Sequence, residues 1–295
     1  MRYLVSQEKL IQLSGNKVIF PYYHFISEKT PLHLVHKHKT LNDFKTDLSY
    51  LLSHFQPISL TELLEHKKNN IPFQKNSFHL TFDEGFYNLH SEIAPILKEH
   101  EIPATIFVAP STINNVSLPF EFKKNILSNE LYTNTVLDFH PNQESELDEL
   151  ARTFSIDWNN YLSENQPFLT SKKIEELISN GFTIGSLIYN HHEIGSEQLK
   201  QQVILESQLV KNQFNLDYSV CAFHYSDKKL NHNFFSFIEK YIDISFGTHG
   251  LLNEKTNNHK QRILIDKAQK AEDILKITYS NYWLKKLCFK NTIKR

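Results

Sequence analysis

The chain has 295 residues, of which 40% are hydrophobic, so it is long enough to bury one large core or two modest ones. Its net charge is −1 without a long run of like charge, which argues against binding to nucleic acid or to an anionic membrane. Two cysteines are too few for a disulfide framework, an apolar run long enough to span a membrane is missing, and the first 16 residues lack the apolar segment of an export signal, so a cytoplasmic protein is predicted.

Predicted strands and helices alternate along most of the chain. The predicted strands are short apolar runs at residues 17–26, 78–82, 104–109, 182–188, 219–223, 242–246 and 262–265. The predicted helices are 41–55, a shorter one from 59, 93–99, 171–180, 197–214, 233–241 and a last one from 271. Because strands that alternate with helices form a mostly parallel sheet, six or seven such units predict an α/β protein with a (β/α) barrel.

The alternation stops between about residues 110 and 167, where the sequence is polar and irregular with some helical texture. We interpret this segment as an insertion in a single domain that spans residues 1–295. Since it follows the end of the predicted strand 104–109, we expect it to lie over or beside the barrel mouth and to shape access to it.

The stretch from Phe78 to Phe86 is the strongest local signal. An apolar run ends there in two adjacent carboxylates, Asp83 and Glu84, followed by Gly85. One interpretation is a site at the end of a buried strand, where one carboxylate holds a metal ion and its neighbour acts on water. The other interpretation is a helix cap, and spacing alone does not separate the two.

Four motifs stand out along the sequence: Thr81-Phe-Asp-Glu-Gly-Phe86, Glu101-Ile-Pro-Ala-Thr-Ile-Phe107, Gly181-Phe-Thr-Ile-Gly-Ser-Leu-Ile-Tyr-Asn-His191 and Ala222-Phe-His-Tyr225. Together they resemble the motifs of polysaccharide deacetylases, the NodB-homology group of carbohydrate esterases. Their order and spacing agree with the family, and the resemblance runs from about residue 18 to 284. It implies a distorted (β/α) barrel of about seven parallel strands with the site at the carboxyl ends of the strands.

The resemblance also implies roles for particular residues. Asp83 matches the general base, Glu84 and His191 match two ligands of a divalent metal, expected to be zinc, and the backbone N–H of Tyr225 matches an oxyanion donor. The substrate implied is an acetylated sugar or polysaccharide. The first metal histidine of the family falls on Leu187, which cannot bind an ion.

Other departures from the family pattern are concentrated in the same site. Glu84 is one methylene longer than the usual Asp, and the arginine that orients the base in many relatives has no match near Ala222. A Leu-x-x-His segment that would supply the acid is also missing near residues 262–265. Only two of the three metal ligands are therefore retained, and two protein ligands seldom hold a divalent ion tightly.

Several histidines follow predicted strands and are candidates to replace the lost groups. His224 is the strongest of these, because relatives usually carry proline there, and we count it among the candidate catalytic residues with Asp83 and Tyr225. His24 is interpreted as a packing residue near the site rather than as a ligand. His249 is interpreted as solvated, as are the loop histidines His33, His36 and His38.

Three functions remain open from the sequence. The first is a metal-dependent deacetylase that removes N- or O-acetyl groups from a sugar or polysaccharide. The second is a non-catalytic barrel that binds a glycan or a protein in the retained cleft, and metal content would separate it from the first. The third is a hydrolase of another acyl or amide substrate, which a substrate screen would separate.

Overall fold

A computed structural model of the chain describes residues 6–15, 17–31, 33–34, 38–189, 196–266 and 269–295. Its helices are α1 (Gln7–Leu13), α2 (Leu41–His54), α3 (Leu60–Lys68), α4 (Ala94–Glu99), α5 (Phe120–Glu130), α6 (Glu144–Thr153), α7 (Trp158–Asn165), α8 (Ser171–Ser179), α9 (Ser196–Gln213), α10 (His232–Ile238) and α11 (Ala271–Leu287). Its strands are β1 (Val18–Ile19), β2 (Pro21–Tyr23), β3 (Gln56–Pro57), β4 (Ser77–Phe78), β5 (Leu80–Phe82), β6 (Ala104–Val108), β7 (Thr183–Ile188), β8 (Val220–Phe223), β9 (Ile244–Gly247), β10 (His259–Gln261) and β11 (Ile263–Leu264).

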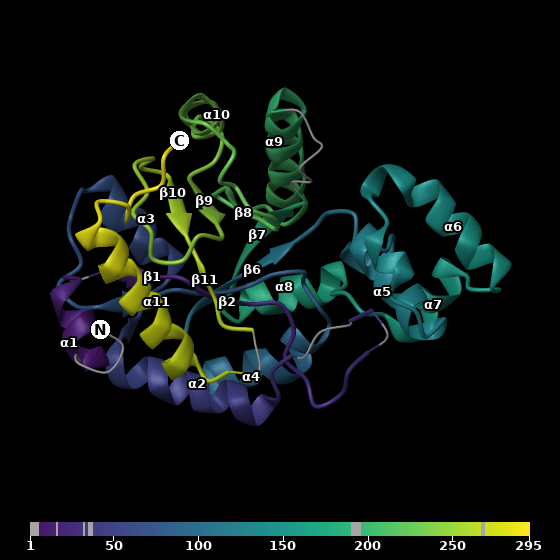
Figure 1. Cartoon of the computed structure of the whole chain (residues 1–295), viewed down its shortest axis with the longest axis horizontal. Helices are drawn as coiled ribbons and strands as arrows, with labels where there is room; N and C mark the ends of the chain where they lie inside the picture. Colours follow the sequence, from purple (N-terminus) through teal and green to yellow (C-terminus); the bar gives the residue numbers. More distant parts are fainter. Residues whose placement is uncertain (1–5, 16, 32, 35–37, 190–195, 267–268) are drawn as a thin grey trace.

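The strands form a nearly closed parallel barrel, as predicted (Figure 1). The main sheet has the order β10-β9-β8-β7-β6-β5-β2-β11, and every neighbouring pair in it is parallel. Its two edge strands, β10 and β11, are separated only by Arg262. Because β10 pairs with β9 and β11 pairs with β2, this one segment joins both edges of the sheet. The described strands therefore close a barrel in which β10 and β11 together act as the last strand, which confirms the prediction of about seven.

Side chains from neighbouring strands pack together in the core. Phe107 of β6, Leu187 of β7, Ala222 of β8 and Phe246 of β9 belong to one buried cluster. Every residue of β6 is buried, as expected for a strand covered on both faces in a parallel sheet. Leu187, which stands at the position of a metal histidine in the family motif, is fully buried in this cluster.

Two helices begin where the sequence predicted. Thr40 and Asp43 form a capping box at the start of α2, and Ser59 and Glu62 form another at the start of α3. In each box the hydroxyl accepts a bond from the backbone N–H three residues on, while the carboxylate accepts one from the cap's own N–H. These bonds satisfy donors that a helix cannot pair internally.

The segment between β6 and α8 contains α5, α6 and α7, which stand to one side of the barrel (Figure 1). Its last residues run beside the first motif, where Leu169 N–H donates to Gly85 O at 2.8 Å and Tyr87 N–H donates to Pro167 O at 2.8 Å. Phe86 and Phe168 pair across this antiparallel contact. The inserted helices are thus held by backbone bonds beside the mouth of the barrel.

His33 also joins the insertion to the barrel, and the prediction that it is solvated was wrong. Its side chain is buried, stacks on Phe86 and lies 2.8 Å from the Tyr161 hydroxyl. Burial lowers the pKa of His33 to about 4, so the ring packs as a neutral aromatic group. His36 lies outside the described residues, and the ring of His38 packs against Phe25.

None of the helices in the described part of the chain is both long and apolar enough to cross a membrane.

Gly85 generates the first testable prediction, because its backbone has φ +65° and a Cβ there would lie 2.6 Å from Cγ1 of Val108. Left-handed backbone costs a non-glycine residue roughly 1–2 kcal/mol, and overpacking a core adds about 1–3 kcal/mol. Gly85→Ala should therefore lower the free energy of unfolding by more than Gly181→Ala, where φ is +88° and a Cβ meets nothing within 4 Å. Urea denaturation measures both variants, and equal losses would contradict the close contact with Val108.

Candidate active site

Five side chains that are candidates for a functional site lie just beyond the carboxyl ends of different strands. His24 follows β2, Glu84 follows β5, Tyr189 follows β7, His224 follows β8 and Asp266 follows β11. Because all these strands are parallel, their carboxyl ends open at the same mouth, where sites of such barrels form. His24, Glu84, His224, Tyr189 and Asp266 line one cavity of about 260 Å³, which we call the mouth pocket.

Glu84 is directed into the mouth pocket by an unusual backbone. Its φ is +74°, and Gly85 after it has φ +65°. A non-glycine residue in this conformation costs about 1–3 kcal/mol and persists only where the surroundings enforce it, commonly at functional sites. The turn separates Glu84 from Asp83, which stays inside the barrel.

The Glu84 carboxylate is almost fully buried and is surrounded by groups that favour its charged form. Its Oε1 lies 3.0 Å from Nδ1 of His224, and its Oε2 accepts a hydrogen bond from the Tyr189 hydroxyl. Burial by itself would raise the pKa of Glu84, but His224, His24 and the Tyr189 bond together lower it below its usual value. Glu84 is thus an anion in the mouth pocket.

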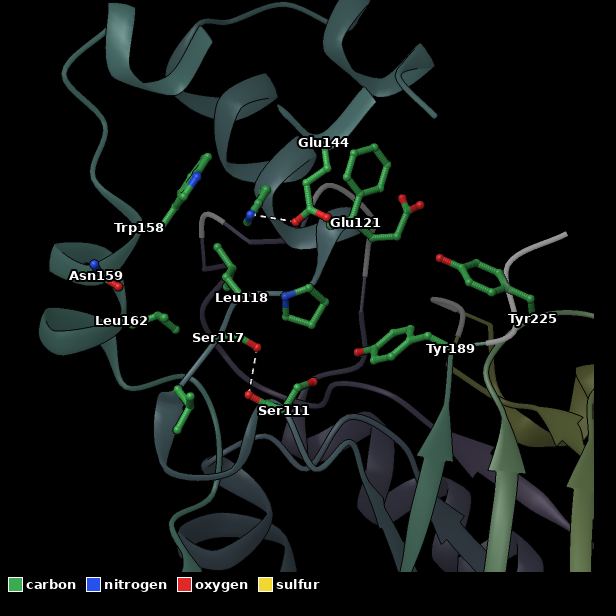
Figure 2. A pocket seen from close by; sticks show the side chains of 14 residues that line it. Ser111, Ser117, Leu118, Glu121, Glu144, Trp158, Asn159, Leu162, Tyr189 and Tyr225 are labelled. Atoms are coloured by element: carbon green, nitrogen blue, oxygen red, sulfur yellow. Dashed lines mark hydrogen bonds and ion pairs between the residues drawn. The ribbon is translucent and has the colours of Figure 1, made fainter. Parts of the chain in front are cut away.

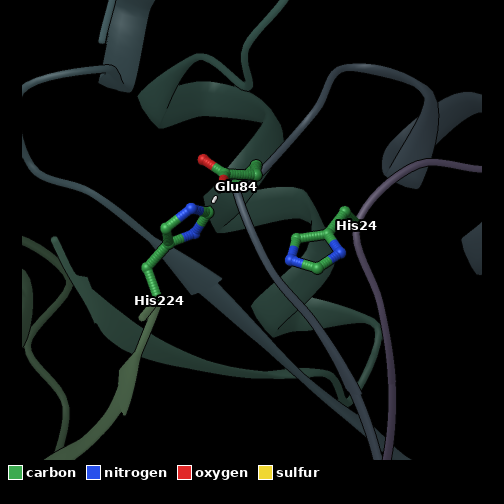
Figure 3. Close-up of side chains that lie close together, drawn as sticks. All are labelled: His24, Glu84 and His224. Carbon is green, nitrogen blue, oxygen red and sulfur yellow. Dashed lines mark ion pairs between the residues drawn. The ribbon is translucent and has the colours of Figure 1, made fainter. Parts of the chain in front are cut away.

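His24 is oriented by a second carboxylate. Its Nδ1 donates to Oδ2 of Asp266 at 2.9 Å, so that Nε2 is the ring nitrogen left for other chemistry. Figure 3 shows the His24 ring beside Glu84 and His224. Burial would lower the pKa of His24, but the bond and charge of Asp266 and the charges of Asp83 and Glu84 together outweigh it and raise the pKa to about 9. His24 therefore lines the mouth pocket with its Nδ1 paired to Asp266, and its role, which the sequence assigned to packing near the site, stays a prediction.

The residues fit a divalent metal ion. His24, Glu84 and His224 each offer a ligand atom, and these atoms lie within 4.8 Å of one another. Nδ1 of His224 is buried and has no hydrogen-bond partner among the described residues, although it faces Oε1 of Glu84 at 3.0 Å, as two ligands of a shared ion would. The Asp266 carboxylate behind His24 is a partner that metal-binding histidines commonly have. Two imidazoles and one carboxylate form a donor set typical of zinc.

The predicted ligand His191 lies outside the described residues, so its place relative to this cluster stays a prediction. His249, predicted to be solvated, is half-buried 3.4 Å from Asp227 and does not line the mouth pocket. Tyr225 lines the mouth pocket beside His224, and its ring meets the imidazole edge to face.

Asp83 forms a bidentate ion pair with Arg262 inside the barrel. Arg262 Nη1 donates to Oδ1 at 2.6 Å and Nη2 donates to Oδ2 at 2.9 Å, with both side chains fully buried. The guanidinium also lies over the Tyr22 ring, 4.3 Å from its centroid, and donates to Phe223 O. Asp83 is therefore not a helix cap. It sits directly behind Glu84 and is not among the residues that line the mouth pocket.

Arg262 was not predicted from the sequence as the partner of Asp83, because the family pattern places the arginine that orients the base near Ala222. Arg262 instead comes from the break between β10 and β11 and reaches the same aspartate across the barrel. A signal was present, since the arginine precedes the apolar run Ile263-Leu-Ile265, where an isolated charge needs a partner. Tyr189 and Asp266 were also not predicted as site residues, because neither stands at a position to which the family motifs give a role.

Comparisons with known proteins agree with this architecture. A family model for polysaccharide deacetylase matches residues 70–218. The chain is 22% identical over 215 residues to a poly-β-1,6-N-acetyl-D-glucosamine N-deacetylase of Staphylococcus epidermidis, an alignment that covers 66% of this chain and 72% of the relative. Among solved structures, the Streptococcus pyogenes deacetylase PplD in complex with acetate has a TM-score of 0.60 at 15% identity and covers 88% of this chain and 97% of that one. IcaB from Ammonifex degensii has a TM-score of 0.60 at 12% identity, with 90% and 97% covered.

The buried ion pair makes a prediction about stability. Arg262→Gln leaves the Asp83 carboxylate buried without a counter-charge, which should lower the free energy of unfolding by about 3–5 kcal/mol. Asp83→Asn in the same background removes that charge, so the double variant should lose less than the sum of the two single losses. Chemical denaturation measures the cycle, with Arg152→Gln on the exposed face of α6 as the matched control. Additive losses would contradict a direct pair.

Proposed function

The chain belongs to the polysaccharide deacetylase family, and on that premise we propose that it hydrolyses N-acetyl groups of an N-acetylhexosamine polymer in the mouth pocket. The observation that carries this proposal is the cluster of His24, Glu84 and His224 beside the paired Asp83. The relative that acts on poly-β-1,6-N-acetyl-D-glucosamine makes the β-1,6-linked polymer the first substrate to test.

We propose that Glu84, His224 and His24 hold a divalent metal, with zinc as the leading candidate. Three protein ligands leave positions open, and a bound ion there would supply an activated water and stabilise negative charge on the acetyl oxygen. Glu84 and His224 are brought together by the ends of β5 and β8 without Leu187. This set would replace the histidine that the family motif places at Leu187.

Asp83 is proposed as the general base that takes a proton from the attacking water. Arg262 holds both carboxylate oxygens and so orients the base, which is the positioning that an arginine gives in many relatives. A base must come within hydrogen-bond reach of the water, and such contacts tighten when substrate binds. The Tyr225 backbone N–H is proposed to donate to the developing oxyanion.

The products are acetate and a free amine, and the breaking C–N bond requires a proton on the nitrogen. His24 is also suited to donate this proton, because Asp266 holds its Nδ1 and keeps the ring in the mouth pocket. The two proposed roles of His24, proton donor to the leaving amine and metal ligand, predict different results for His24→Gln. His24→Gln that keeps its metal but loses turnover would assign the acid role, and loss of both would assign the ligand role.

A non-catalytic barrel that binds a glycan remains the second candidate function. The observation that favours it is the loss of a histidine at Leu187, whose side chain packs in the core. A purified protein that binds glycan without metal and without turnover would establish that function instead.

The metal proposal predicts the metal content of single variants. Glu84→Gln and His224→Gln should each reduce stoichiometric zinc after reconstitution by at least about tenfold, because two protein ligands seldom retain a divalent ion. Elemental analysis after dialysis measures the content, and His232→Gln, at an exposed position on α10, is the control. Zinc retained in both variants would overturn the proposed ligand set.

The base proposal predicts a loss of activity without a loss of metal. Asp83→Asn should lower kcat on an acetylated β-1,6-glucosamine oligomer by about 100- to 10,000-fold, the usual worth of general-base help. Since Asn also leaves Arg262 unpaired, Asp83→Asn should be compared with Asp83→Asn/Arg262→Gln, which removes both charges. Activity retained in either folded variant would exclude Asp83 as the base.

A further inference from the structure

Two further cavities differ in their relation to the mouth pocket. One, of about 400 Å³, lies between the inserted helices and the barrel and shares Glu121, Tyr189 and Tyr225 with the mouth pocket, so it belongs to the site already described (Figure 2). The other, of about 480 Å³, shares no lining residue with the mouth pocket. We call it the basic pocket, and its lining includes His66, Lys67, Asn70, Phe73, Asn258 and Lys260.

The basic pocket lies at the end of the barrel opposite the mouth pocket. Lys67 stands in the last turn of α3 and donates from Nζ to the backbone O of Asp243 at 2.6 Å, directly before β9. Asn258 directly precedes β10, which carries Lys260. Because β9 and β10 are parallel to the strands that end at the mouth pocket, these residues gather at the amino ends of the strands.

Two ammonium groups, those of Lys67 and Lys260, line this cavity without a paired carboxylate. Within the described part of the chain, Lys67 bonds to a carbonyl oxygen, and the ammonium group of Lys260 has neither a hydrogen bond nor an ion pair. Burial lowers the pKa of both lysines, and the charge of Lys67 lowers that of Lys260 further. The more distant charges of Asp243 and Glu239 oppose this at Lys67, and that of Glu254 opposes it at Lys260.

This arrangement costs the folded protein stability. Partly buried charges are normally paired, and like charges repel one another more strongly away from bulk water. Lys67 and Lys260 are both partly buried, and the fold brings them together from α3 and β10. An anionic ligand would supply the counter-charge that the described residues leave out.

The rest of the lining suits a ligand larger than a simple ion. The His66 ring stacks flat on Phe73, with ring centroids 3.9 Å apart and an angle of 10° between the planes, and its Nδ1 lies 2.9 Å from Ile71 O, which fixes its orientation. Asn70 and Asn258 add amide groups that can donate hydrogen bonds. The volume falls in the range of roughly 300–1,000 Å³ for small-molecule sites.

The charge of the pocket selects the chemical class of the anion. A phosphate monoester carries about −1.5 to −2 at pH 7, which matches two ammonium groups, whereas a carboxylate carries a single charge. Lysine commonly binds phosphate as a point charge. The flat stack of His66 and Phe73 then leaves an apolar surface for the organic part of the ligand.

From this geometry we propose that the basic pocket binds a phosphate monoester of a small organic molecule, either a sugar phosphate or a nucleotide. Lys67 and Lys260 hold the phosphate group, and the stack of His66 and Phe73 contacts the organic part. The site is independent of the deacetylase function proposed above, because its lining residues include none of the groups proposed for that chemistry.

Titration calorimetry with glucose 6-phosphate and with AMP tests the proposal on the whole chain. At least one ester should bind saturably, while glucose and adenosine, which lack the phosphate, should not. Lys67→Met and Lys260→Met should each weaken binding by at least about tenfold, the usual worth of a charge-assisted hydrogen bond. Lys68→Met, which removes an exposed charge next to Lys67 from outside the pocket, should leave the affinity unchanged.

The probes also separate the possible sources of the phosphate. Tighter binding of AMP would support a nucleotide whose base lies on Phe73, and tighter binding of glucose 6-phosphate would support a sugar phosphate. Inorganic phosphate bound as tightly as either ester would overturn the proposal of an ester. So would the absence of saturable binding, or binding that survives both lysine variants and is lost in His224→Gln, which would place the anion in the mouth pocket.

A stability measurement tests the missing counter-charge without any ligand. Lys260→Met keeps the length of the side chain and removes a charge that burial and Lys67 disfavour, so it should raise the midpoint of urea denaturation. Lys68→Met, at an exposed position, should leave the midpoint unchanged. A lower midpoint for Lys260→Met would show that this charge already has a stabilising partner, which would overturn the argument for an anion.

Discussion

The buried ion pair between Asp83 and Arg262 is the interaction on which the rest of the structure depends. Two charges inside a barrel require close geometry, and this pair has two bonds of 2.6 and 2.9 Å with both side chains fully buried. Arg262 also stands at the one residue where the last segment changes partners from β9 to β2. The side chain that orients the proposed base therefore comes from the backbone position that closes the barrel.

In the first motif, the ion pair with Arg262 holds Asp83 apart from its neighbour Glu84. Asp83 stays inside with Arg262, while the left-handed backbone of Glu84 turns the next carboxylate into the mouth pocket. Gly85 completes the turn, and the end of the insertion bonds to it through Leu169. One short turn thus places the proposed metal ligand and separates it from the proposed base.

The proposed metal site would be a case of ligand chemistry that has moved between strands. The histidine that the family motif places on β7 is replaced by Leu187, which packs in the core, and the imidazole of His224 now follows β8, where it faces Glu84. His24 and its partner Asp266 lie at the ends of β2 and β11. Parallel strand ends converge on one mouth, so a lost donor on one strand can be replaced from another without a change of fold.

The sequence by itself determined the alternation of strands and helices, the starts of α2 and α3 and the carboxylates at the end of β5. These follow from local patterns, because apolar period, caps and turn residues act over a few positions. Only the tertiary structure decided that Arg262 reaches Asp83 across 179 positions and that Asp266 reaches His24 across 242. It likewise decided that His33 is buried rather than solvated. Such contacts depend on which strands become neighbours when the barrel closes, and the pattern along the chain does not encode the direction of a side chain across it.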